Sequence, residues 1–337
     1  MKLSTLTKTG GILAASVLAL TACGGGGTES NGGSGNGDGP QAEMADPDRD
    51  WENCTPGANA QDVTDTEADD NTDITLGAFD GWDESFAAAH LTKAVLEEDG
   101  YSVDIESYQA GPGFTGVANG DIDVVLDGWM PLTHKDYVEE FGDKMEVHGC
   151  WYNNAKLTIA VNEDSPAQSI ADLKDMGDEY GNTLYGIEPG AGLTSTTENE
   201  AIPTYGLDNL DFKISSTPAM LAQLKKATDA GDNVAVTLWR PHWAYDAFPV
   251  RDLEDPEGAM GGAEVIYNFA RDGFAEDNPK AAQLLQNLVL DDENLASLEN
   301  VMFSDENYGG ENLDEAVAEW LKDNPDFAED WKAGKLS

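Results

Sequence analysis

The chain has 337 residues, of which 65 are Asp or Glu and 18 are Lys or Arg, so its formal net charge is −47. Repulsion between this charge and a phosphate backbone excludes nucleic acid as a partner. The chain holds four histidines, which leave little for metal chemistry, and we expect neither a metal nor another cofactor.

Residues 1–22 are typical of an export signal. Lys2 and Lys8 give a positive start, and the stretch from Gly10 to Leu20 is small, apolar and too short to span a bilayer. The sequence Leu20-Thr21-Ala22-Cys23 resembles a bacterial lipobox, which implies cleavage before Cys23 and lipidation there; the alternative is an unmodified cysteine. We therefore expect a monomer held by lipid on the extracytoplasmic face of the cell membrane.

Residues 23–73 are rich in Gly, Ser, Asn and Asp, and they predict a flexible acidic stalk, because such a segment cannot bury enough apolar surface to offset its chain entropy. If Cys23 carries lipid, Cys54 and Cys150 are left as an even pair. Outside the cytoplasm such a pair suggests a disulfide, which would pin the end of the stalk to the globular body; two free thiols are the alternative.

The body begins with alternating strands and helices. We expect strands at residues 74–79, 101–108 and 122–126, separated by helices at 84–98 and 111–119. The last of these strands is a nearly continuous apolar run, as in a strand covered on both faces. This alternation predicts a mostly parallel sheet with helices on its faces.

A second series follows. Its expected strands are 156–161, 183–187, 212–215 and 234–238, and its expected helices are 169–176, 193–205 and 218–230; three further helices are expected at 278–290, 294–302 and 313–322. Two α/β series predict two lobes with a ligand cleft at the carboxyl ends of their strands. We assign residues 74–157 to lobe 1, 158–249 to lobe 2, and 250–337 to a return to lobe 1 with C-terminal helices.

Three tryptophans lie where a strand ends beside Gly or Pro: Trp82 follows Gly81, Trp129 follows Gly128, and Trp239 ends a strand before Pro241. Tryptophans placed there can line a cleft, although each can also be a core residue. Aromatic faces are suited to a quaternary ammonium, whose charge cannot be satisfied by hydrogen bonds. Trp243 is expected to be a packing residue.

The segment from Gly186 to Gly192 joins a predicted strand to a predicted helix. Its small residues let backbone N–H groups point at an anion, and it lacks the spacing of a phosphate-binding loop, so a carboxylate is favoured over a polyphosphate. His242 and Arg240, close to Trp239, are further donors to the same carboxylate. An ordinary Gly-rich turn and a structural histidine are the competing interpretations.

Four elements occur in order: Gly-Trp-Asp-Glu-Ser at 81–85, Gly-Asp-Ile-Asp-Val with Trp129-Met-Pro, Gly-Ile-Glu-Pro-Gly-Ala-Gly at 186–192, and Leu-Trp-Arg-Pro-His-Trp at 238–243. Together they resemble the glycine betaine-binding proteins of ABC importers, from about residue 74 to about 331. The resemblance implies a type II periplasmic-binding-protein-like fold, an ABC permease as partner and no enzymatic activity. It implies a cage of Trp82, Trp129 and Trp239, with a carboxylate held by Gly186, Ile187 and His242.

Other functions remain open. Choline, carnitine or proline betaine is the alternative ligand, and the acids Asp80, Asp83 and Asp127 beside the tryptophans are compatible with choline, which has no carboxylate. An exported hydrolase lacks support, because the chain contains neither a Gly-x-Ser-x-Gly elbow nor His-Glu-x-x-His. A surface adhesin is disfavoured by the α/β alternation and the absence of repeats.

The dispersed acidic charge predicts a protein adapted to a salt-rich habitat. Self-repulsion of the acids destabilises the folded state at low ionic strength, and salt screens this repulsion. We expect the free energy of unfolding to rise with salt concentration, measured by denaturant titration in a series of NaCl concentrations. Stability that does not increase with salt would leave an acidic exported protein with no such adaptation.

Overall fold

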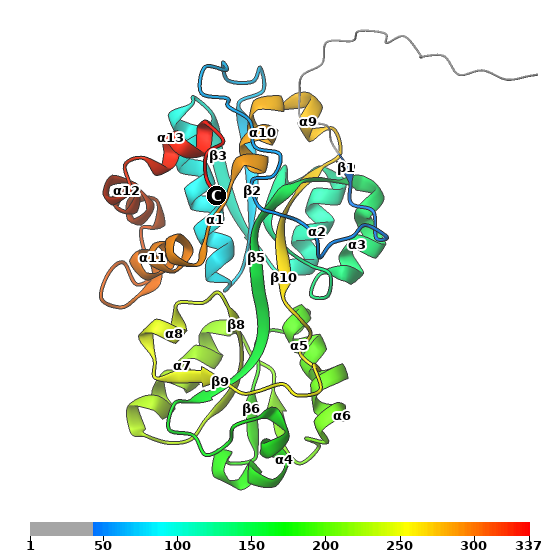
Figure 1. Ribbon diagram of the computed structural model, residues 1–337, viewed down its shortest axis with the longest axis vertical. Helices are drawn as coiled ribbons and strands as arrows, with labels where there is room; N and C mark the ends of the chain where they lie inside the picture. The colour runs from blue at the N-terminus through cyan, green and yellow to red at the C-terminus, as the bar shows by residue number, and fades with distance from the viewer. Residues whose placement is uncertain (1–42) are drawn as a thin grey trace, which may run out of the picture. The chain divides into compact units, whose positions relative to one another are not determined.

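The computed structural model describes residues 43–337. The predicted signal peptide, Cys23 and the first part of the predicted stalk lie outside the described residues. The main strands follow the spatial order β3-β2-β4-β10-β5-β8-β6-β7, and β1 and β9 each pair with β5 (Figure 1). The mixed α/β architecture expected from the sequence is present.

The first sheet is parallel at one end and antiparallel at the other. β2 (Asp73–Phe79) pairs in parallel with β3 (Ser102–Tyr108) and with β4 (Val124–Met130). β10 (Glu264–Arg271) then runs antiparallel to both β4 and β5. β10, which comes late in the chain, is thereby inserted beside β4. It pairs with the carboxyl end of β4, where Trp129 lies.

One long strand, β5 (Met145–Asn162), belongs to both sheets (Figure 1). Its first part pairs with β10, and its last residues pair with β8 (Ala235–Arg240). β6 (Thr183–Tyr185) is parallel to both β8 and β7 (Asp211–Lys213). β9 (Val250–Asp252) also pairs with β5 in this second sheet. The lobe boundaries remain a prediction; by strand pairing, the chain rejoins the first sheet at β10.

Helices pack beside both sheets. The following helices either adjoin strands of the first sheet in the sequence or pack with the helices that do: α1 (Asp83–Glu98), α2 (Ala110–Asn119), α3 (Lys135–Phe141), α9 (Phe274–Asp277), α10 (Pro279–Asn287), α11 (Asp292–Phe303), α12 (Leu313–Asp323) and α13 (Phe327–Lys332). The second sheet carries α4 (Leu173–Met176), α5 (Gly192–Thr196), α6 (Ile202–Tyr205), α7 (Thr217–Ala230) and α8 (Ala244–Ala247).

Two of the expected elements differ in the structure. The helix expected at 193–205 consists of α5, a π-helical turn at Thr197–Ala201 and α6. The helix expected at 169–176 is a 3-10 turn followed by the four-residue α4. β10, α3 and the first half of β5 were not expected.

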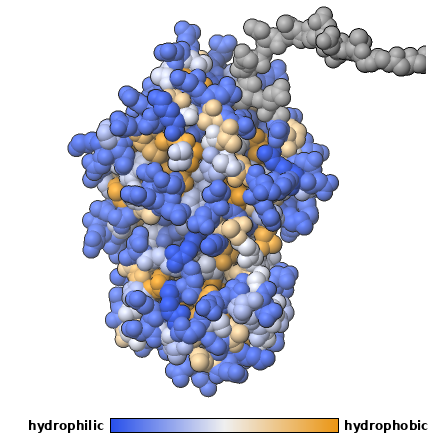
Figure 2. Space-filling view, in the orientation of Figure 1, coloured by the Kyte–Doolittle hydropathy of each residue, from blue (hydrophilic) through white to orange (hydrophobic). Residues whose placement is uncertain are grey.

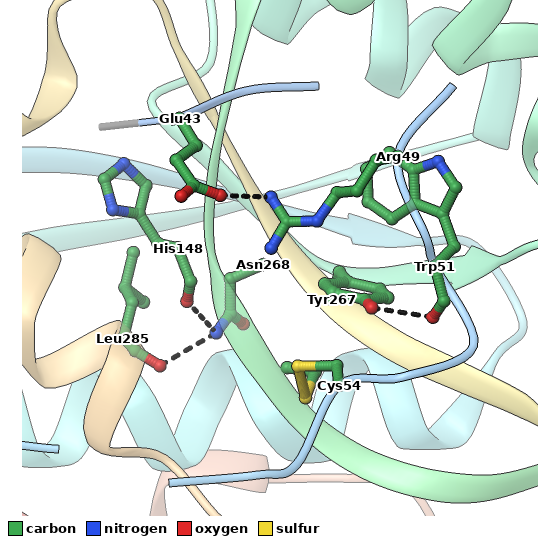
Figure 3. Close-up of a disulfide and its surroundings, with 9 residues drawn as sticks. Glu43, Arg49, Trp51, Cys54, His148, Tyr267, Asn268 and Leu285 are labelled. Carbon is green, nitrogen blue, oxygen red and sulfur yellow. Dashed lines mark hydrogen bonds and ion pairs between the residues drawn. A yellow bond between two sulfur atoms is a disulfide. The ribbon is translucent and has the colours of Figure 1, made fainter. Parts of the chain in front are cut away.

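Residues 43–73 pack on the body, which corrects this part of the flexible-stalk prediction. β1 (Glu43–Met44) pairs with β5, and Trp51 and Val63 are buried. A disulfide joins Cys54 to Cys150 on β5, close to Tyr267, whose hydroxyl donates to the Trp51 carbonyl (Figure 3). The physical reason is that scattered apolar residues and one cross-link order a segment whose average composition is polar.

The surface is dominated by hydrophilic residues, with apolar residues in small separate areas on the face shown in Figure 2. Within residues 43–337, no helix combines the length and the apolar character that crossing a membrane requires.

Candidate functional site

The three predicted cage tryptophans come from the carboxyl ends of three strands. Trp82 lies three residues beyond β2, at the start of α1, whereas Trp129 and Trp239 are the next-to-last residues of β4 and β8. The peptide bonds Met130–Pro131 and Arg240–Pro241 that follow them are both cis. Strand ends from both sheets therefore carry the three indoles to one place.

That place is a small cavity with a volume of about 20 Å³. All three indoles line its wall, and none of these tryptophans is more than 6% exposed. Ile187 and Glu84, which carries a carboxyl group, also line it. The remaining wall is formed by Thr133, Leu157 and Leu193. A wall of aromatic and aliphatic side chains with a few polar groups is typical of sites for small organic ligands.

Carboxylates hold two of the indole nitrogens. Trp129 Nε1 donates to Asp127 Oδ1 at 2.6 Å, and Trp82 Nε1 donates to Glu188 Oε1 at 2.6 Å. Glu188 belongs to the second sheet's loop and also accepts from the backbone N–H and hydroxyl of Thr217. Since the edges of these rings are fixed by hydrogen bonds, their faces remain available to the cavity. Trp239 Nε1 has no hydrogen-bond acceptor among residues 43–337.

The loop after Trp129 is fixed from both sides. The Trp129 N–H donates to His134 Nδ1 at 2.9 Å, and the His134 N–H donates to the Trp129 carbonyl at 3.0 Å. Buried Glu264 on β10 accepts from the backbone N–H groups of Leu132 and Thr133, each at 2.9 Å. The unexpected strand β10 thus positions a wall of the cavity.

Of the two backbone N–H groups predicted to bind the carboxylate, one already donates a hydrogen bond within the protein and one does not. The Gly186 N–H donates to the Lys213 carbonyl at 2.9 Å, so this group already has an acceptor. Ile187 lies in the cavity wall, and its N–H donates to no protein acceptor within the described part of the chain. Arg240 turns away, since its Nε pairs with Asp252 at 2.7 Å and its guanidinium covers Tyr245.

His242 is buried beside the cage rather than in its wall. Its Nδ1 accepts from the Ala244 N–H at 3.0 Å, so the ring proton is on Nε2, and that atom lies 4.0 Å from Asp83 Oδ2. The ring packs edge-to-face with Trp239 at 4.6 Å between centroids. Burial lowers its pKa to about 3, so the imidazole is neutral at physiological pH. Trp243 also approaches α1, donating from Nε1 to Asp83.

His134 was not singled out in the sequence, although the structure places it against the cage. Its ring stacks on Trp82 with an angle of 14° between the planes, and its buried Nε2 has no partner within residues 43–337. Burial lowers its pKa to about 3. Because Nδ1 accepts from Trp129, Nε2 carries the proton and is an unused donor. Its position five residues after Trp129 was the available signal.

Buried acids lie behind the cage. Burial raises the pKa of Asp127 to about 7 and that of Asp83 to about 7. Burial, followed by repulsion from neighbouring carboxyl groups, raises the pKa of Glu84 and of Glu299 on α11 well above the usual range. The group of acids next to an aromatic cavity was not foreseen from the sequence, although Asp83 and Asp127 were noted beside their tryptophans.

Close contacts bring the two sheets' loops together around the cavity. Gly192, at the start of α5, approaches the loop after β4 so closely that a Cβ there would lie 2.3 Å from the Thr133 carbonyl oxygen. Gly81, with φ +86°, lies against Thr217 in the same way. The Tyr137 hydroxyl donates to the Gly190 carbonyl at 3.1 Å.

These features define an α/β solute-binding protein with a buried aromatic cavity. The chain belongs to the OpuAC family, the substrate-binding domain of ABC-type glycine betaine transport systems, whose model matches residues 72–323. Members of this family bind transport substrates and are not enzymes.

Relatives of known function support the same family. The glycine betaine/carnitine transport binding protein GbuC of Listeria monocytogenes is 38% identical over 163 residues, covering 48% of this chain and 52% of that protein. The glycine betaine-binding periplasmic protein OusX of Dickeya dadantii is 28% identical, covering 64% of this chain and 76% of that protein. The match thus spans about half of the Listeria protein's length.

Two solved structures share the fold. Lactococcal OpuAC in its closed conformation with glycine betaine gives a TM-score of 0.71 at 26% identity, covering 77% of this chain and 99% of that one. A choline-binding protein in complex with choline gives 0.69 at 28% identity, covering 78% and 92%. The expected type II periplasmic-binding-protein-like fold is confirmed.

The contact at Gly192 yields a test. A methyl group there forces α5 away from Thr133, so Gly192→Ala should weaken glycine betaine binding by about tenfold or more while the melting temperature changes little, because the clash is between two loops rather than within a core. Gly262→Ala is the matched control, since a Cβ at that position meets no atom within 4 Å. Equal affinity of the two variants, measured by calorimetric titration, would show that this contact is not part of the ligand-bound state.

Proposed function

We propose that this protein captures a quaternary ammonium zwitterion, with glycine betaine as the first candidate, in a cage formed by Trp82, Trp129 and Trp239. It then delivers this osmoprotective solute to the permease of an ABC importer. The observation that carries the proposal is that three indoles from separate strand ends line one buried cavity. Their family's association with glycine betaine transport agrees with it.

The physical basis is the match between methylated cation and aromatic faces. Each cation–π contact contributes about 0.5–2 kcal/mol, with the larger values where water is excluded. Three such contacts and a few charge-assisted hydrogen bonds together supply the net of about −8 kcal/mol that micromolar binding needs. Burial of all three rings keeps the contacts dry.

We assign the carboxylate of the ligand to the side of the cavity formed by Ile187. The Ile187 N–H is the backbone donor, since the N–H of Gly186 already has an acceptor. Two histidines offer a neutral Nε2–H. Both Nε2 atoms are buried without a hydrogen-bond partner among residues 43–337, and each ring packs on a cage indole. His134 is favoured on one difference, which is that the Nε2 of His242 lies 4.0 Å from Asp83 Oδ2.

Choline is the second candidate ligand, and one observation favours it. Glu84 brings a carboxyl group into the cavity wall, where it can face a cation that has no carboxylate of its own. The choline-binding protein that shares this fold makes choline a necessary member of any ligand panel.

Calorimetric titration of the whole chain with glycine betaine and with choline tests both the tryptophan cage and the proposed carboxylate site. Trp239→Ala should weaken both ligands by about 10- to 30-fold, because one aromatic face is lost, and Trp239→Phe should lose less. His134→Ala should weaken glycine betaine and leave choline nearly unchanged, since only the former carries a carboxylate.

Trp320→Phe is the matched control for the tryptophan variants, because Trp320 of α12 is a buried tryptophan outside the cavity wall. If the wild-type chain binds no quaternary ammonium, the cage proposal is wrong. If His242→Ala selectively weakens glycine betaine and His134→Ala does not, the carboxylate belongs to His242, as the sequence suggested.

We also propose that lipid on Cys23 tethers the protein to the outer face of the cell membrane, and that it acts as a monomer. The support is the lipobox-like sequence before Cys23, which lies outside the described residues. The Cys23→Ser variant, expressed in a bacterial host that processes lipoproteins, should leave the membrane fraction on immunoblots. Continued membrane retention of that variant after a carbonate wash would argue for another mode of attachment.

A further inference from the structure

Glu84 has an unusual place in the proposed cage. Its side chain is only 1% exposed, it lies in the wall of the cavity with the indoles, and its Oε2 forms no hydrogen bond of normal geometry within residues 43–337. The Trp239 side chain and the Glu84 backbone N–H lower the pKa of this carboxyl group, but burial and neighbouring acids outweigh them. A buried carboxyl group with an oxygen left unpaired is costly, and the cost is greatest when the group is ionised. A carboxyl group that persists at such a position is therefore a candidate for a role that appears only when the cavity is filled.

Two more carboxyl groups lie behind Glu84. Asp127 Oδ2 and both carboxyl oxygens of Glu299 are buried and unpartnered among the described residues. Both raise the pKa of Glu84 by repulsion, after the larger effect of burial. Like charges in one dry site cannot all be ionised, and burial together with these neighbours favours the protonated form of Glu84.

The surroundings of the group supply no compensating cation. The leading electrostatic influences on Glu84, Asp127 and Glu299 among the described residues are carboxyl groups and hydrogen-bond donors, with no basic side chain. On the outer side of α1, Lys93 and His90 pair with Asp314 of α12. The other ionisable groups that face the cluster are Asp83 on α1, Asp246 on α8, Tyr152 on β5 and the neutral His242.

We propose that Glu84 is a titratable counter-ion of the cage: it is protonated when the cavity is empty and gives up its proton when a quaternary ammonium enters. The O–H bond of the Glu84 carboxyl breaks, the proton passes to solvent, and the carboxylate that remains faces the cationic head. Binding of one cation is thereby coupled to release of one proton, and the net charge of the site is unchanged. This inference rests on the proposed function.

The coupling has a definite sign. A cation beside Glu84 lowers its pKa relative to the empty site, so proton release occurs between the pKa of the bound state and that of the free state. Affinity for the cation should rise with pH in that window, by at most about one log unit per pH unit for one proton. Below the lower pKa and above the higher one, affinity should be flat with respect to Glu84. His134 and His242 are neutral throughout, because burial keeps the pKa of each at about 3.

Calorimetric titration with choline in two buffers of different ionisation enthalpy, such as phosphate and Tris, measures the released protons directly. For the wild-type chain near neutral pH we expect the observed enthalpy to depend on the buffer, with the sign of proton release. We expect the Kd for choline to fall as the pH is raised between the pKa of Glu84 in the bound state and its pKa in the empty state, with a slope no greater than the limit for one proton.

Glu84→Gln retains the size of the side chain and removes the titration. It should abolish the difference between the buffers, flatten the pH profile, and weaken choline more than glycine betaine above neutral pH, because glycine betaine keeps its second anchor. Asp314→Asn is the matched control, since Asp314 of α12 pairs with His90 and Lys93 on the outer side of α1. It should leave proton release unchanged. Thermal unfolding reports whether each variant is folded.

The outcomes separate this inference from the proposed function. Binding of quaternary ammonium ligands by the wild type with equal enthalpies in both buffers and a flat pH profile would overturn the role of Glu84 and leave the cage intact. Proton release that persists in Glu84→Gln would place the titration on another group and also overturn it. If no quaternary ammonium binds at any pH, the proposed function itself fails.

Discussion

A buried indole nitrogen needs an acceptor, and for two of the three cavity tryptophans the acceptor is a carboxyl group. Trp129 is held by Asp127, and Trp82 is held by Glu188, which reaches it from the other sheet's loop. These hydrogen bonds turn the ring edges outward from the cavity and fix the faces toward it. The same requirement explains why Asp127 and Glu188 are buried, so these two acids and the indoles that they hold are one structural feature. Glu84 and Glu299 are a separate feature, because Glu84 Oε2 and both carboxyl oxygens of Glu299 have no hydrogen-bond partner within residues 43–337.

The topology brings the wall together from distant parts of the chain. β5 belongs to both sheets, so the carboxyl ends of β4 and β8 are held on one continuous framework. β10 enters between β4 and β5, and its Glu264 accepts the backbone N–H groups of the loop that follows Trp129. A strand near the end of the chain thus fixes a loop that lies more than a hundred residues earlier. Small residues at Gly81 and Gly192 then allow the loops of the two sheets to approach.

Periodicity was enough to predict α1 and the parallel strands β2, β3 and β4. Strand-end motifs indicated that Trp82, Trp129 and Trp239 can each line a cleft, and the family resemblance implied that they do so together. β10 escaped prediction because a strand inserted between distant partners leaves no local pattern of a βαβ unit. His134 escaped because its importance depends on stacking with Trp82, a contact between residues 52 positions apart. The packed segment around Trp51 escaped because average composition hides a few well-placed apolar residues and a cross-link. What remained beyond prediction was set by tertiary contacts.

The two ends of the proposed site differ in their chemistry, and this difference bears on selectivity. At the carboxylate end the donors are neutral: a backbone N–H at Ile187 and histidines whose protonation is prevented by burial. Such donors recognise an anion by direction, and they carry no charge that would require a counter-ion in the empty site. At the ammonium end, aromatic faces are backed by acids whose ionisation is itself suppressed by burial. Suppressing the ionisation of these acids reduces the desolvation penalty of isolated ions in the empty cavity, just as neutral donors do at the other end.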